Sequence, residues 1–104
     1  MPTRLDAARE AATTAATNAL AGRGVEAVLC DQLAAEIVAV LLIARSERGL
    51  TWLRGMRATA RQNELINRHH TISALTLFAT RTALQDAMVA AADALVAALG
   101  RRTN

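Results

Sequence analysis

The segment from Val25 to Arg45 carries apolar residues on two sides of a helix, and this pattern constrains the fold more than any other. With about 100° between successive residues, one side carries Leu29, Leu33, Ile37, Val40 and Leu41. The second side carries Val28, Ala35, Val38 and Leu42. A helix that is apolar on two sides needs two partners. We therefore expect this segment to carry most of the packing in a helical protein.

Three further segments show apolar residues at spacings of three and four, and no stretch has the alternation that is typical of β-strands. The predicted helices span about residues 3–22, 25–45, 51–68 and 71–99. The last of them carries a heptad-like row made of Leu77, Leu84, Met88, Leu95 and Leu99. Short connections favour antiparallel neighbours. The sequence thus predicts an all-α, antiparallel four-helix bundle that forms one domain over residues 1–104.

Several residues mark the ends of these helices. Thr3 and Asp6 have the spacing of a capping box at the start of the first helix. Gly22 and Gly24 are typical of the turn that ends it. We expect a break near His69 between the last two helices. No glycine or proline marks that break, so a single kinked helix is the alternative.

The chain has more apolar residues than a small bundle can bury. Hydrophobic residues make up 53% of its 104 residues, whereas aromatic residues make up 2%. Alanine-rich faces on the first and last helices, together with the two-sided helix between them, would leave apolar surface exposed on a monomer. We therefore predict a homo-oligomer, in the simplest case a twofold dimer. Trp52 is expected to anchor the core or that interface.

The number of cysteines and the length of the longest apolar run indicate in which cellular compartment the protein is expected. Cys30 is the only cysteine, so no internal disulfide can form, and its position among apolar residues predicts a core side chain. No leader of secretory type is recognisable. The longest apolar run, Ile37 to Ala44, is much shorter than the roughly 20 residues of a membrane span. We expect a cytoplasmic protein without a membrane span.

Arginines define the first candidate site. All twelve basic residues are arginine, and nine acidic residues leave a formal net charge of +3. On a continuous helix over residues 51–68, an arc of roughly 60° holds Arg54, Arg57, Arg61 and Arg68. Guanidinium groups bind phosphate and carboxylate groups. The leading hypothesis is a small non-enzymatic interaction module that presents this arginine face to an acidic protein or a nucleic-acid backbone. The alternative is a solvated face with local ion pairs to Glu47 and Glu64.

Polar residues on otherwise apolar faces define a second candidate site. It consists of Glu36, Asn63, Asn67, His70, Arg81 and Gln85. A buried arginine must be paired, so we expect Glu36 or a helix carbonyl to meet Arg81. The functional alternative is a ligand-binding or catalytic pocket that accepts an anion on Arg81, with His70 as a proton carrier. A structural network or a polar interface would explain the same residues, and the sequence leaves open whether any reaction is catalysed.

Metal and cofactor sites are not expected. His69 and His70 are adjacent and therefore point about 100° apart on a helix. Glu64 does not stand three residues from either histidine, as it would in a carboxylate-bridged metal bundle. No other motif indicates a cofactor.

Overall fold

Six α-helices make up the fold in the computed structural model, which describes residues 2–100. They are α1 (Arg4–Gly22), α2 (Ala27–Arg48), α3 (Leu50–Arg54), α4 (Thr59–Arg68), α5 (His70–Leu75) and α6 (Arg81–Leu99). No strand forms within residues 2–100, so the prediction of an all-α protein is confirmed. The number of helices differs from the four predicted, because two of the expected helices are each divided in two.

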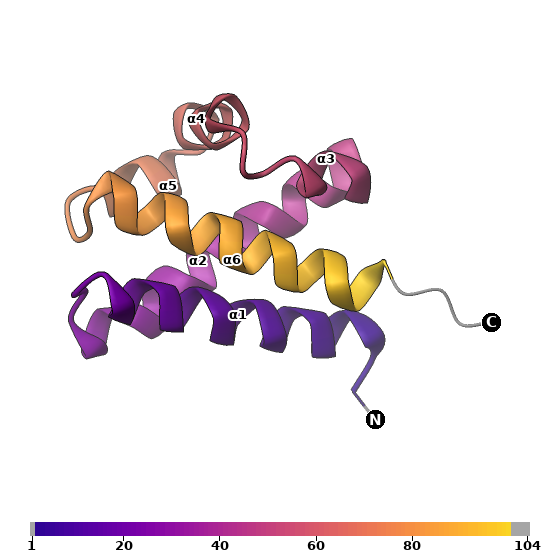
Figure 1. Ribbon diagram of the computed structural model, residues 1–104, viewed down its shortest axis with the longest axis horizontal. Coiled ribbons are helices and arrows are strands. Elements are labelled where there is room, and N and C mark those ends of the chain that lie inside the picture. The colour runs from indigo at the N-terminus through magenta and orange to yellow at the C-terminus, as the bar shows by residue number, and fades with distance from the viewer. Residues whose placement is uncertain (1, 101–104) are drawn as a thin grey trace.

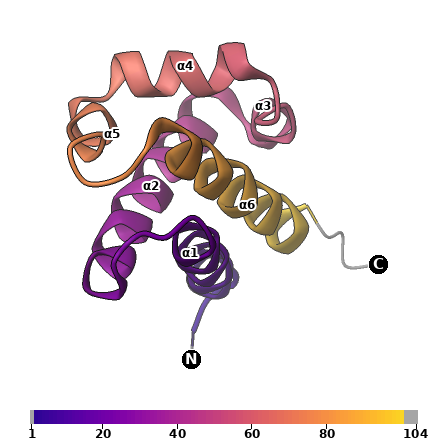
Figure 2. The same cartoon turned by 60° about the vertical axis from the view of Figure 1, so that its left-hand side comes forward.

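Helices α1 and α6 lie side by side and antiparallel along the length of the molecule (Figures 1 and 2). Their buried faces consist largely of alanine, with Ala8, Ala12 and Ala16 fully buried on α1. Because these side chains end at Cβ, the two helix axes can approach closely. At one end of the pair, the Arg4 guanidinium donates hydrogen bonds to the carbonyl oxygens of Ala98 and Leu99, at 3.2 and 3.3 Å. Arg4 thereby caps the last turn of α6.

Helix α2 is the central element, as its two-sided apolar pattern predicted. It packs against α1, α6, α3 and α5. Its buried residues are Cys30, Leu33, Ala34, Ile37, Val38, Val40, Leu41 and Ala44. The core position expected for Cys30 is confirmed, because 2% of this residue is exposed. Part of the predicted second apolar side is not covered, since Val28 and Ala35 are exposed.

By length and composition alone, α2 and α6 could each cross a membrane. The longest apolar run in the sequence did not predict this, because single polar residues interrupt longer stretches of high mean hydropathy. Both helices also supply the core of the fold, which accounts for the apolar residues that they bury. In the most apolar stretch of α2, however, only 44% of the residues are buried. The exposed remainder of α2 includes the apolar residues Val28, Ala35, Ala39 and Ile43, which the core does not explain.

The helix predicted over residues 51–68 is interrupted between Arg54 and Thr59. Gly55 ends α3, and the buried side chain of Gln62 reaches back from α4 to the interrupted segment. Its Nε2 donates hydrogen bonds to the carbonyl oxygens of Met56 and Arg57, at 2.9 and 3.4 Å. These bonds satisfy carbonyls that a continuous helix would have paired internally. The sequence pattern missed the break because apolar spacing continues through it.

The helix predicted over residues 71–99 is interrupted between Leu75 and Arg81. Thr80 begins α6 as its N-cap, and its hydroxyl oxygen accepts a hydrogen bond from the backbone N–H of Ala83 at 3.1 Å. Leu77 lies in the interruption and is 81% exposed. Its predicted place in the apolar row of the last helix is therefore wrong, whereas Leu84, Met88 and Leu95 of that row are buried.

Two local predictions are confirmed. The capping box at α1 is complete, because the Thr3 hydroxyl accepts from the N–H of Asp6 and the Asp6 carboxylate accepts from the N–H of Thr3. The expected break near His69 is also present. His69 has an extended backbone between α4 and α5, so these are separate helices rather than one kinked helix.

Candidate interaction surface

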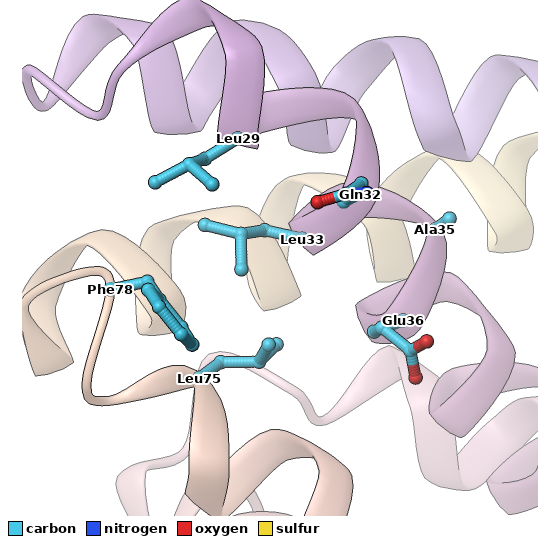
Figure 3. A pocket seen from close by; sticks show the side chains of 7 residues that line it. All are labelled: Leu29, Gln32, Leu33, Ala35, Glu36, Leu75 and Phe78. Carbon is cyan, nitrogen blue, oxygen red and sulfur yellow. The ribbon is translucent and has the colours of Figure 1, made fainter.

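An apolar groove of about 440 Å³ lies between α2 and α5. Leu29 and Leu33 of α2 form one side, and Leu75 and Phe78 lie across from them (Figure 3). Gln32, Ala35 and Glu36 complete the lining at the edge provided by α2. We call this cavity the α2–α5 groove. Its shape comes from helix α2 and from the interruption after Leu75, which places the Phe78 ring opposite α2.

Large exposed apolar residues lie on α2 and on the segment that follows α5. Within the described chain, Val28 (76% exposed) and Ile43 (47%) lie on α2, and Leu77 (81%) and Phe78 (56%) lie in the segment that follows α5. A second cavity shares Leu29 and Phe78 with the first and is also lined by Leu77. The apolar surface that Leu29, Leu77 and Phe78 form together is typical of an interaction site.

Glu36 lines the α2–α5 groove and Glu26 lines the neighbouring cavity, whereas Asp31 lines neither. Glu26, Asp31 and Glu36 are exposed on or next to α2, and none of them forms an ion pair with another described residue. The only contact of Asp31 is a long hydrogen bond of 3.5 Å from the Thr17 hydroxyl. The Glu36 carboxylate at the edge of the apolar groove weakens the approach of another negative charge.

The four arginines of the predicted face do not share one helix. Arg54 ends α3, Arg57 lies in the interruption, and Arg61 and Arg68 belong to α4. Arg57 pairs with Asp93 at 2.8 Å, and Arg68 pairs with Glu47 at 3.1 Å. The expected pairing with Glu64 comes instead from Arg48, at 3.2 Å. The predicted arc assumed a continuous helix, and the break after Arg54 removes that geometry.

Arg61 contacts Trp52 and has a structural role. Its Nη1 donates a hydrogen bond to the carbonyl oxygen of Trp52, and its guanidinium carbon lies 5.3 Å from the centroid of the Trp52 ring. Arg48 lies at the same distance from that ring. Trp52 is partly buried against the core, so the two guanidiniums hold an anchor residue in place.

The second set of candidate residues is only partly brought together. Arg81 is exposed rather than buried, and its Nη2 donates a hydrogen bond to Oδ1 of Asn63. Glu36 lines the α2–α5 groove, and Arg81 lines neither this groove nor the cavities at Arg57 and at Leu77. The other three residues, Asn67, His70 and Gln85, make no hydrogen bond that would join them to Arg81. The expected pairing of a buried Arg81 with Glu36 is therefore wrong.

The sequence analysis missed Gln62 and considered His69 only for a metal site and a helix break. Gln62 is the buried polar side chain that holds the interruption after α3. Its spacing of three and four from Leu65 and Ile66, which are both buried, could have placed it on the inner face of α4. His69 has a buried Nε2 without a hydrogen-bond partner among the described atoms. Among residues 2–100, no group of three or more histidine, cysteine or acidic side chains is placed to hold a metal ion.

Comparison of the chain with protein-family models, curated proteins and solved structures finds no match in any of the three. Its function must therefore be argued from the surface described above.

Proposed function

We propose that this protein is a small non-enzymatic interaction module that works as a homo-oligomer, and that the α2–α5 groove and the exposed part of α2 form its self-association surface. The observation that carries this proposal is the exposure of Val28 and Ile43 on α2 and of Leu77 and Phe78 beside the α2–α5 groove. Of the large apolar residues exposed on the described surface, only Leu5 lies elsewhere, on α1. Burial of such side chains contributes roughly 1.5–3 kcal/mol for each one that is fully covered.

The arginines take a smaller part in this proposal. Arg54 is exposed and forms no ion pair with a described residue, and Arg57 is exposed although it pairs with Asp93. Exposed ion pairs are weak, at about 0–1 kcal/mol, so a phosphate or carboxylate of an acidic partner could compete for Arg57. We therefore keep binding of an acidic protein or a nucleic-acid backbone as a second role of the module, with Arg54 and Arg57 as its contacts.

An anion-accepting pocket at Arg81 and His70 receives less support. The contact between Arg81 and Asn63 is the one observation in its favour. Both Arg81 and His70 are exposed, and a catalytic group needs a positioned partner. We do not propose an enzymatic function.

Sedimentation equilibrium of the wild-type protein over a wide concentration range tests self-association. We expect a mass of twice the 11.0 kDa of the chain at high concentration. Phe78→Ser should shift the equilibrium towards monomer, because it removes apolar area from the groove. Leu5→Ser is the matched control and should leave the equilibrium unchanged. A wild-type protein that stays monomeric at every concentration would refute the proposal.

A further inference from the structure

Six residues of α2 form one face that the fold leaves largely uncovered. They are Val28, Gln32, Ala35, Ala39, Leu42 and Ser46, of which only Leu42 is partly covered. With about 100° per residue they lie within an arc of about 80°, on the side of α2 opposite the fully buried Ile37. We call this set the α2 face.

The spacing of the α2 face is that of a coiled-coil seam. Successive members are separated alternately by four and three residues, which is the repeat that keeps a seam in contact with a second helix. Ala35 and Ala39 stand at its middle, where small side chains allow two helices to approach to about 8 Å. The described part of the chain supplies no helix that covers this seam.

We infer that the α2 face pairs with the α2 face of a second copy of this chain, with the two helices antiparallel and related by a twofold axis near Ile37. This inference rests on the proposed self-association and adds its geometry. A twofold axis makes the contacts reciprocal. The layers of the seam then match Val28 with Ser46, Gln32 with Leu42, and Ala35 with Ala39 of the second copy.

The charges beside the α2 face favour the antiparallel direction. Asp31 flanks the face near the start of α2, and Arg45 flanks it on the same side near the end. Neither forms an ion pair with a described residue. The antiparallel register places Asp31 opposite Arg45 of the second copy, and symmetry creates this pair twice. A parallel pairing would instead place Asp31 across the seam from Glu36 of the second copy, which brings two carboxylates together.

The apolar residues on the other flank fit the same register. Leu29 and Ile43 lie on the side of α2 that borders the α2–α5 groove, and the register places each of them opposite the other in the second copy. Ile43 of the second copy would thus enter the lip of the groove beside Phe78. Pairing through α2 therefore covers both exposed large apolar residues of that helix, Val28 and Ile43.

One contact in this register is unfavourable, and it supplies a sharp test. Glu36 lies on the groove side of the α2 face, and the twofold axis brings Glu36 close to its own copy. Two like charges that face each other across an interface weaken it. Glu36→Gln should therefore strengthen the dimer and lower its dissociation constant several-fold, whereas Glu10→Gln, at an exposed position of α1, should not change it.

Disulfide trapping tests the direction of pairing. Ala35→Cys and Ala39→Cys are each made in a Cys30→Ala chain, one of them is labelled with nitrogen-15, and the two are mixed and oxidised. Antiparallel pairing brings position 35 next to position 39, whereas like positions are offset along the axis by roughly 6 Å, which is too far for a disulfide across two helices. We expect mass spectrometry to show that the fraction of disulfides joining position 35 to position 39 is well above the one half expected for random pairing.

A charge exchange provides an independent test that introduces no cysteine. Asp31→Arg and Arg45→Asp should each raise the dissociation constant of the dimer about tenfold, because each turns two attractions into repulsions. The double variant should restore wild-type affinity. Glu10→Arg is the control for a change of charge on an exposed helix.

The outcomes separate the inference from the proposed function. A dimer with an excess of like disulfides, or one that the charge exchange does not restore, would overturn the antiparallel pairing and leave self-association standing. A chain that is monomeric at every concentration, including one that binds lipid vesicles through α2 instead, would overturn both.

Discussion

Replacement of Gly55 by alanine tests how the chain turns between α3 and α4. A Cβ atom at this position would overlap the guanidinium of Arg61. The backbone itself accepts alanine, because the φ of Gly55 is −91°. Gly55 is therefore required by the neighbouring side chain and not by its own conformation.

The expected magnitude follows from what Arg61 would lose. Its displacement breaks a charged hydrogen bond to the Trp52 carbonyl, worth about 1.5 kcal/mol, and a contact with the Trp52 ring, worth about 0.5–1 kcal/mol. Replacement of glycine by alanine in a tolerated conformation stabilises a protein by about 0.4–1 kcal/mol, because it restricts the unfolded chain. The Gly55→Ala protein should therefore be less stable than wild type by about 1–2 kcal/mol.

The sign of the effect should reverse when Arg61 is absent. In an Arg61→Ala chain the overlap disappears, so Gly55→Ala should raise the free energy of unfolding by about 0.4–1 kcal/mol. Urea denaturation of the four proteins, followed by far-ultraviolet circular dichroism, measures this cycle. If Gly55→Ala stabilised both backgrounds equally, the proposed role of Arg61 would be refuted.

Three further substitutions test the rest of the fold by urea denaturation. Gln62→Leu should cost about 1–3 kcal/mol, because it leaves the carbonyl of Met56 without its buried donor; no loss of stability would mean that water replaces the bond. Ala12→Leu should lower the free energy of unfolding by about 1–3 kcal/mol, because it overpacks a fully buried site. Ala11→Leu, at an exposed site of the same helix, should be nearly neutral. Asp6 has a pKa held below its ordinary value by the hydrogen bonds of the capping box, first the backbone N–H and then the hydroxyl of its cap residue. Its carboxylate therefore stabilises the fold above about pH 4, and this contribution is lost as the pH falls through the lowered pKa; wild type should lose stability over that range more steeply than Asp6→Asn, and parallel curves would contradict this.

Local signals in the sequence predicted the start of α1 and its end well. The capping box of Thr3 and Asp6, and the glycines after α1, act on their own neighbours, so their effect does not depend on distant contacts. The all-α class and the central position of α2 followed from apolar spacing for a similar reason. A helix with two apolar sides favours partners on both, although the fold covers only part of the second side of α2.

The two missed interruptions depend on contacts that spacing cannot reveal. The break after α3 is held by Gln62 and by Arg61, which reach back across it from α4. The break before α6 is marked by Thr80, a capping residue that lies within an otherwise helical pattern. Apolar spacing continues through both places, so it predicted continuous helices.

The predicted arginine face failed geometrically for the same reason. Positions on a helix wheel are meaningful only while the helix continues, and the chain turns between Arg54 and Arg61. The partners of Arg57 and Arg68 are Asp93 and Glu47, which come from α6 and α2. Their proximity is a property of the tertiary fold. The excess of apolar surface, by contrast, is a property of composition, and the exposed residues around the α2–α5 groove account for part of it.

The oligomeric mass of the wild-type protein tests the central claim most directly. Analytical ultracentrifugation of the wild type beside an Ala39→Arg variant, which places a bulky charge at the middle of the α2 face, needs no partner and no ligand. We predict that the wild type sediments at twice the mass of the chain and that the variant sediments as a folded monomer. A wild-type monomer, or a variant dimer of unchanged affinity, would contradict the account.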